Sequence, residues 1–238
     1  MSNFNEIAEE FEEQIPEHMR LHYMEKKTKL MEGVLHELKN SDCLIGLDLG
    51  CGLGWHSQKL SIDGYRNIIG LDYSKNMVRI AKAKYNLPCF MVGAAQCLPF
   101  KNESLDFVYS ITAFHHMEAS IQKTAFDEIE RILKLGGYFF LHEINIRNPV
   151  FRLYMRHIFP RTRKIDTGEE EWLPIQKLNE LCSLKLVEVN CFTFVPDFIP
   201  KCIFPLFRKI ESILEETVLS RYGIHYMATF KKVKRTEE

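Results

Sequence analysis

The sequence predicts an α/β fold built on a doubly wound, mostly parallel sheet. Short apolar runs alternate with segments of helical period, and only short turns join them. In addition, the first apolar run is followed directly by "GCGLG" at residues 50–54. Alternate glycines cost backbone entropy in regular structure, so this loop indicates that something approaches the backbone closely.

The elements of the first 145 residues are expected in a fixed order. Residues 1–40 have spaced apolar positions typical of helices, divided at Pro16, and form an N-terminal helical cap. Apolar runs predict five strands, at residues 44–49, 67–71, 89–92, 106–111 and 138–144. Helices are expected between them at residues 55–60, 75–85 and 121–133. Ser74 is the expected N-cap of the second, and Gly136 and Gly137 end the third.

The C-terminal third shows a different order of predicted helices and strands. It predicts a helix over residues 175–181, a strand over 186–194 and a terminal strand within 223–232. Between the last two, four residues recur at a helical period and are expected to share one face: Phe204, Phe207, Ile210 and Leu214. With no internal repeat or linker, we expect a single domain over residues 1–238. Its cofactor-binding core is expected at 44–145, and its substrate-side elements at 146–238.

The composition of the 238 residues limits the class of protein. A formal charge of −1 gives no field that would gather nucleic acid, so no nucleic-acid partner is expected. No apolar run reaches the roughly 18 residues of a membrane span, and the acidic N-terminal residues lack a signal-peptide core. We therefore expect a cytoplasmic location and no integral membrane association. The seven cysteines form no C-x-x-C pair, which predicts buried free thiols and no metal site.

The glycine loop predicts a ligand site. In an open parallel sheet, ligands bind beyond the carboxyl ends of the strands, where the strand order reverses, and this loop follows the first strand. Its G-x-G-x-G spacing places Trp55 where the dinucleotide pattern has its third glycine, which counts against NAD or FAD. Asp72 ends the second strand about 20 residues later, where a nucleotide-binding sheet places a carboxylate for ribose hydroxyls. As a structural alternative, Asp72 forms a turn.

Four stretches in this order resemble the class I S-adenosylmethionine-dependent methyltransferases of the small-molecule, type 11-like branch. They are "LDLGCGLG", "IIGLDYSKNMVRIAKAKY", "LPFKNESLDFVYSITAFHHM" and "EIERILKLGGYFFLHEIN", and together they cover about residues 44–145. The resemblance implies S-adenosylmethionine as cofactor. It also implies a Rossmann-like seven-stranded sheet with an antiparallel C-terminal strand.

The resemblance also assigns residues to the cofactor. It places Asp72 on the ribose hydroxyls and Tyr73 beside the adenine. The methionine half would contact the glycine loop and the aspartate before it; that set is Asp48, Gly50, Cys51, Gly52 and Gly54. Ala95 and Gln96 would lie at the adenine. One departure stands out: Ala94 occupies the position where the family often has an aspartate that accepts from the adenine amino group.

The candidate catalytic residues follow the fourth and fifth strands. A general base is needed only if the acceptor must lose a proton. His115, with His116 beside it, is the first candidate, and Glu143 is an alternative base or substrate anchor. A structural role for the histidine and a solvated position for the carboxylate remain the simpler readings.

The sequence leaves the acceptor open. No Asn/Asp-Pro-Pro-Tyr follows the fourth strand, which disfavours a nucleobase amine. The segment 192–207 is either a core connection or an apolar lid over a hydrophobic acceptor. Likewise Tyr23, Lys26 and Lys29 either close the cofactor site or form surface. We expect methyl transfer to a small molecule, with an apolar or lipid-like one as the narrower option. The alternative is a non-catalytic, S-adenosylmethionine-binding partner protein.

Overall fold

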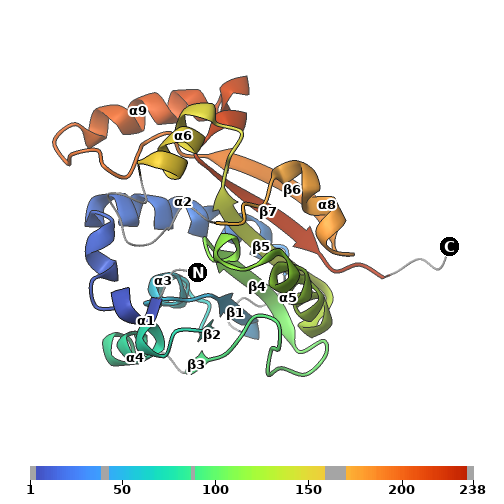
Figure 1. Cartoon of the computed structure of the whole chain (residues 1–238). Coiled ribbons are helices and arrows are strands. Elements are labelled where there is room, and N and C mark those ends of the chain that lie inside the picture. The colour runs from blue at the N-terminus through green and yellow to red at the C-terminus, as the bar shows by residue number, and fades with distance from the viewer. Residues whose placement is uncertain (1–3, 39–42, 87–88, 159–169, 235–238) are drawn as a thin grey trace.

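The protein is described by a computed structural model over residues 4–38, 43–86, 89–158 and 170–234 (Figure 1). These residues form a seven-stranded sheet of order β3-β2-β1-β4-β5-β7-β6. The strands are β1 (Ile45–Leu49), β2 (Asn67–Asp72), β3 (Cys89–Val92), β4 (Leu105–Ile111), β5 (Leu133–Ile144), β6 (Lys185–Phe192) and β7 (His225–Lys231). The first five run parallel, and β7 is antiparallel to both of its neighbours. The predicted sheet is confirmed, including its antiparallel C-terminal strand.

Helices precede, connect and follow these strands. Before β1 lie α1 (Phe4–Ile7), the 3-10 helix η1 (Phe11–Gln14) and α2 (Glu17–Leu35). Between strands lie α3 (Trp55–Ile62), α4 (Lys75–Lys84), η3 (Phe114–His116) and α5 (Ala119–Ile132). After β5 come α6 (Pro149–His157), η4 (Ile175–Lys177), α8 (Leu178–Leu181), α9 (Phe204–Glu215) and η5 (Val218–Tyr222). The N-cap prediction at Ser74 is confirmed, because its hydroxyl accepts from the Met77 amide. No helix within the described ranges is long and apolar enough to cross a membrane.

The sheet is buried on both faces, and the alternation along β5 shows how. Phe139 and Leu141 pack in a core with α5 and α8, whereas Tyr138 and Phe140 pack in a second core with α2 and α3. A strand covered by helices on both faces reads as a continuous apolar run, which is why "YFFL" gives no polar alternation. The arrangement leaves the carboxyl edge of the strands, near the N-terminal helices, as the place for a site (Figure 1).

Gly136 and Gly137 do not end a helix as predicted. Helix α5 stops at Ile132 and β5 begins at the next residue, so both glycines lie inside the strand. Gly136 has φ +84°, and its amide donates to the Lys232 carbonyl across the sheet. The register of β5 against β4 shifts at this point. The pair therefore forms an irregular start to a longer strand, since a glycine pair suits a bulge as well as a helix end.

One further expectation needs correction, and the structure adds two features that the sequence pattern did not indicate. The cysteines are free, but Cys43, Cys97 and Cys202 are exposed and only Cys51 is buried. Helix α6 was not predicted from the sequence pattern at all. On α9, Ile210 is 45% exposed while Glu211 is 1% exposed, so the buried face of that helix includes a carboxylate.

Candidate functional site

A cavity of about 230 Å³ opens at the carboxyl ends of the central strands. The N-terminal segment lines it through Phe4, Phe11 and Ile15, and the glycine loop lines it through residues 50–53. Its apolar wall also includes Ile144 and residues of α6. The cavity is thus enclosed by the first and the last thirds of the chain around the sheet edge where the sequence predicts a ligand.

The glycine loop exposes its backbone to the cavity. Gly50, Gly52 and Gly54 all have positive φ, at +78°, +51° and +78°. A Cβ at Gly50 would lie 2.5 Å from the Cβ of Ala113, so that glycine is required by the protein itself. A Cβ at Gly52 would have no protein atom within 4 Å. Gly52 therefore borders open space, as expected where a ligand approaches the backbone.

Asp72 ends β2 and holds the glycine loop. Its Oδ2 accepts from the Gly52 amide and its Oδ1 from the Ser74 amide, both at 2.8 Å. Burial raises the pKa of this carboxyl, and the two backbone donors act in the opposite direction. Each carboxylate oxygen has a second lone pair, so Asp72 can accept further hydrogen bonds from a ligand. It is both the predicted turn former and a cavity-lining carboxylate.

Asp48 lies under the same loop, near the end of β1, and is 2% exposed. Its Oδ2 accepts from the Ser57 hydroxyl at 2.6 Å, which joins β1 to α3. Burial raises the pKa of Asp48 to about 7, and the hydrogen bond from Ser57 opposes this. A carboxyl poised near neutrality also lines the cavity, where it can accept from or donate to a polar ligand group.

His115 and Glu143, the two predicted catalytic residues, form one buried pair. His115 Nδ1 lies 2.5 Å from Glu143 Oε2, and Glu143 Oε1 accepts from the Phe114 amide at 2.9 Å. The ring of His115 also stacks on Trp172, with centroids 5.1 Å apart. Glu143 thus holds the imidazole ring of His115 in one orientation, as a carboxylate does for a histidine that acts as a base. His115 and His116 both line the cavity.

The other predicted cofactor residues lie in different surroundings. Cys51 lines the cavity with the loop, whereas Tyr73 is 76% exposed, Gln96 is exposed and Ala95 is buried. Those three lie outside the lining of the cavity in the described structure. Their assignment to the adenine stays a prediction.

The residues of α2 separate in a way that the sequence left open. Tyr23 is buried, lines the cavity and donates to the Val195 carbonyl at 2.6 Å. Lys29 is exposed and pairs with Glu25. Lys27, which was not predicted as a site residue, is 6% exposed and lines the cavity. The sequence contains a signal for it, because Lys27 falls in a row of residues four positions apart whose other members, Met19, Tyr23, Met31 and Leu35, are apolar.

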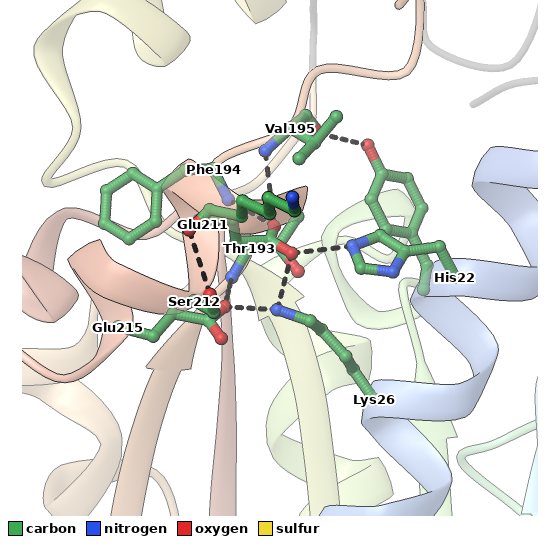
Figure 2. Close-up of polar contacts among 10 residues, drawn as sticks. His22, Lys26, Thr193, Phe194, Val195, Glu211, Ser212 and Glu215 are labelled. Atoms are coloured by element: carbon green, nitrogen blue, oxygen red, sulfur yellow. Dashed lines mark hydrogen bonds and ion pairs between the residues drawn. The ribbon is translucent and has the colours of Figure 1, made fainter. Parts of the chain in front are cut away.

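A buried ionic network ties α2 to α9 (Figure 2). Glu211 Oε2 lies 2.7 Å from both His22 Nε2 and Lys26 Nζ, and Lys26 also pairs with Glu215. Burial would raise the pKa of Glu211, but its bonds to His22 and Lys26 hold it at about 2. The two glutamates also accept from the amides of Thr193, Phe194 and Val195.

This network decides what the segment 192–207 does. The carboxylates of α9 hold its first residues, and Val195 and Ile199 pack on Met19 and Tyr23. Phe198 is exposed and Asp197 lines the cavity. The segment therefore serves as a packed connection and also contributes to the cavity wall.

Comparison with known proteins gives a matching family. Residues 47–141 match the model of a methyltransferase domain. An uncharacterised protein of Methanocaldococcus jannaschii is 37% identical over 52% of this chain and 46% of its own length. The demethylmenaquinone methyltransferase of Lactococcus lactis is 33% identical over 53% of this chain and 56% of its own length. The chain thus spans about half the length of these curated relatives.

Solved structures extend the similarity to nearly the whole chain. A methyltransferase solved in complex with the Haloferax volcanii Trm112 activator superposes with a TM-score of 0.67 and 19% identity. It covers 98% of this chain and 99% of that one. At this identity the likeness concerns the fold, which includes the elements outside residues 47–141.

S-adenosylmethionine, the cofactor of this domain family, fits the residues present. Open space borders Gly52, and the carboxylates of Asp72 and Asp48 line the same cavity and retain acceptor capacity. The cofactor carries amino and hydroxyl donors that such groups bind. The residues that the sequence nominated for its ribose and methionine parts are therefore together in space.

Proposed function

We propose that the protein transfers the methyl group of S-adenosylmethionine to a small-molecule acceptor. The premise is that residues 47–141 match the model of a methyltransferase domain. One observation carries the proposal. A Cβ at Gly52 would meet no protein atom within 4 Å, and Gly52 lines the same cavity as Asp72 and Asp48. A cofactor held there would lie against the backbone that alternate glycines leave bare.

The residues of the cavity support transfer to a small and largely apolar acceptor. Its wall away from the glycine loop consists of side chains such as Ile144, Phe151 and Met155. Water is poorly accommodated by such a wall, and an apolar molecule gains free energy by entering it. The name of the Lactococcus relative, a demethylmenaquinone methyltransferase, points to the same class of acceptor.

His115 is the proposed general base. Its ring is fixed by Glu143 through Nδ1 and stacked on Trp172, so its position requires no rearrangement on binding. Methyl transfer from the bound cofactor is an in-line displacement, and alignment of the acceptor supplies much of the rate. His115 would take the proton of an acceptor hydroxyl or amine.

The experiment has two stages. Calorimetry first measures the binding of S-adenosylmethionine and its demethylated product. Methyl-labelled cofactor is then incubated with demethylmenaquinone reduced to its hydroquinone, and with other apolar hydroxyl or amine acceptors, and products are detected by mass spectrometry. His115→Ala should slow transfer about 10²- to 10⁴-fold without changing the dissociation constant of the cofactor. No binding of S-adenosylmethionine would refute the proposal.

The alternative is a cofactor-binding protein without catalysis, which acts as a partner subunit. Ala94 favours it, because it removes a family contact to the adenine. A lost neutral hydrogen bond costs only about 0.5–1.5 kcal/mol, so cofactor binding survives under either hypothesis. Product detection separates the two, since only the enzyme releases methylated acceptor.

A further inference from the structure

Lys27 is a buried cation at the wall of the cavity. Its side chain projects from α2, is 6% exposed and lines the cavity. No hydrogen bond or ion pair joins its ammonium group to another residue in the described ranges. Its Nζ lies 6.0 Å from the centroid of the Tyr23 ring. Lysines are almost never buried without a partner, so this one calls for an anion.

The groups around Lys27 do not supply that anion. Four titratable side chains from three elements interact electrostatically with it: His56 of α3, His142 and Glu143 of β5, and His225 of β7. Glu143 is the one carboxylate among them, and its two oxygens already bind the Phe114 amide and His115. Burial lowers the pKa of Lys27 to about 7, and Glu143 acts in the opposite direction.

The neighbouring histidines have unused polar atoms. Within the described structure, Nδ1 of His56, Nδ1 of His225 and both ring nitrogens of His142 are buried without a hydrogen-bond partner. His56 and His225 also line the cavity. No group of three His, Cys, Asp or Glu among the described residues is arranged to hold a metal ion. Lys27, His56 and His225 instead provide one ammonium and ring N–H groups to an acceptor oxygen in the cavity.

The members of the cluster on β5 and β7 are separated from the glycine loop, whereas His56 follows Gly54 by two residues. His142 and Glu143 lie at the end of β5, and His225 lies at the start of β7. The order of the sheet places β4 between β1, which carries the loop, and these two strands. Lys27 and His225 thus line the same cavity as Phe151 and Met155 of α6.

We propose that Lys27, with His225 beside it, binds an anionic oxygen group of the methyl acceptor. The acceptor is then an apolar molecule with one acidic group, such as a carboxylate or an ionised hydroxyl. This inference rests on the proposed function and names its substrate class. Binding of the anion gives the ammonium group of Lys27 the partner that the protein lacks.

The test uses decanoate and decanol, which share a chain and differ in the anionic group. Their binding is measured by calorimetry at about pH 6 in the presence of the demethylated cofactor. The wild-type protein should bind decanoate at least tenfold more tightly than decanol, since a charge-assisted hydrogen bond is made only by the former. Lys27→Met should bind both equally. Lys29→Met, a change on the same helix at an exposed lysine, should behave as wild type.

The outcomes separate the inference from the proposed function. Equal binding of the two probes by the wild-type protein, or no binding of decanoate, overturns the inference even if the cofactor binds. A tenfold loss of affinity for the demethylated cofactor in Lys27→Met, with the preference for decanoate intact, also overturns it, because the anion is then the cofactor carboxylate. If decanoate is preferred and no cofactor binds, the proposed function fails alone. Thermal melting should show Lys27→Met folded and at least as stable as wild type, because the change removes a buried charge.

Discussion

Replacing Asp72 by alanine tests the link between the glycine loop and the cofactor. The carboxylate accepts from the Gly52 and Ser74 amides at 2.8 Å, and we predict that it also accepts from the ribose hydroxyls. A hydrogen bond to a charged group is worth about 1.5–3 kcal/mol. Loss of the ribose contacts, with partial replacement by water, should weaken S-adenosylmethionine binding by roughly tenfold to a hundredfold.

The same change should also lower stability. Two backbone donors lose their acceptor, but burial of the carboxylate carries a desolvation cost that the alanine removes. We therefore expect a net loss of about 2 kcal/mol, which lowers the melting temperature by roughly 4–8 °C in a protein of this size. The sequence does not indicate this loss, because the hydrogen bond from Gly52 to Asp72 is visible only in three dimensions.

Calorimetry and thermal melting provide the assay, and Asp127→Ala provides the control. Asp127 is an exposed carboxylate on α5, so its loss should change neither quantity. Asp72→Asn keeps one acceptor oxygen and should lie between alanine and wild type in both measurements. Suppose that Asp72→Ala binds the cofactor as tightly as wild type while its melting temperature falls. Then the carboxylate acts only on the loop, and the ribose assignment is wrong.

Three further changes give distinct results. Gly52→Ala and Gly64→Ala both place a side chain at positive φ with open space around it. Each variant should therefore lose about 1–2 kcal/mol of unfolding free energy. Only Gly52→Ala should reduce the affinity for the cofactor in a titration. Burial lowers the pKa of Lys27 to about 7 from about 10.5, so between these values the unfolded chain binds the extra proton and stability rises with pH. Urea unfolding should show this rise, about 3–5 kcal/mol, in wild type relative to Lys27→Met, and parallel pH profiles would contradict it. The pKa of Glu211 is held at about 2, below its unfolded value near 4.5, so the stability it provides is present above that value and lost as pH falls toward 2. Glu211→Gln should therefore cost about 3–5 kcal/mol at neutral pH in the same assay, whereas Glu216→Gln, at an exposed neighbour, should cost nothing measurable.

The fold could be predicted largely because its signals are local. Strand β3 has the predicted bounds, Cys89–Val92, and the N-cap at Ser74 depends on residues three positions apart. The glycine loop and Asp72 can be recognised as parts of one ligand site because they are about 20 residues apart. Each of these features can be identified in a short window of sequence.

The features that were missed depend on distant partners. Glu211 reads as a solvated residue of an amphipathic helix until His22 and Lys26, about 190 positions earlier, come next to it. Lys27 lies in a run of three cations and one threonine, and only the packing of α2 decides which of them enters the cavity. A glycine such as Gly136 is typical both of a helix end and of a β-bulge, so the sequence alone does not distinguish the two. The register of β5 against its neighbours determines that it lies in a bulge.

The ionic contacts between α2 and α9 have a consequence for how the chain is made. His22 and Lys26 are synthesised well before Glu211 and Glu215, because about 190 residues separate the two pairs along the chain. The segment that α9 holds therefore cannot pack against α2 until α9 has been made. During this interval the nascent protein exposes Tyr23 and the apolar side of α2, as chains awaiting later elements do. A ligand that needs the finished cavity consequently binds only after α9 has packed on α2, and a protein shortened before α9 would be a client of chaperones.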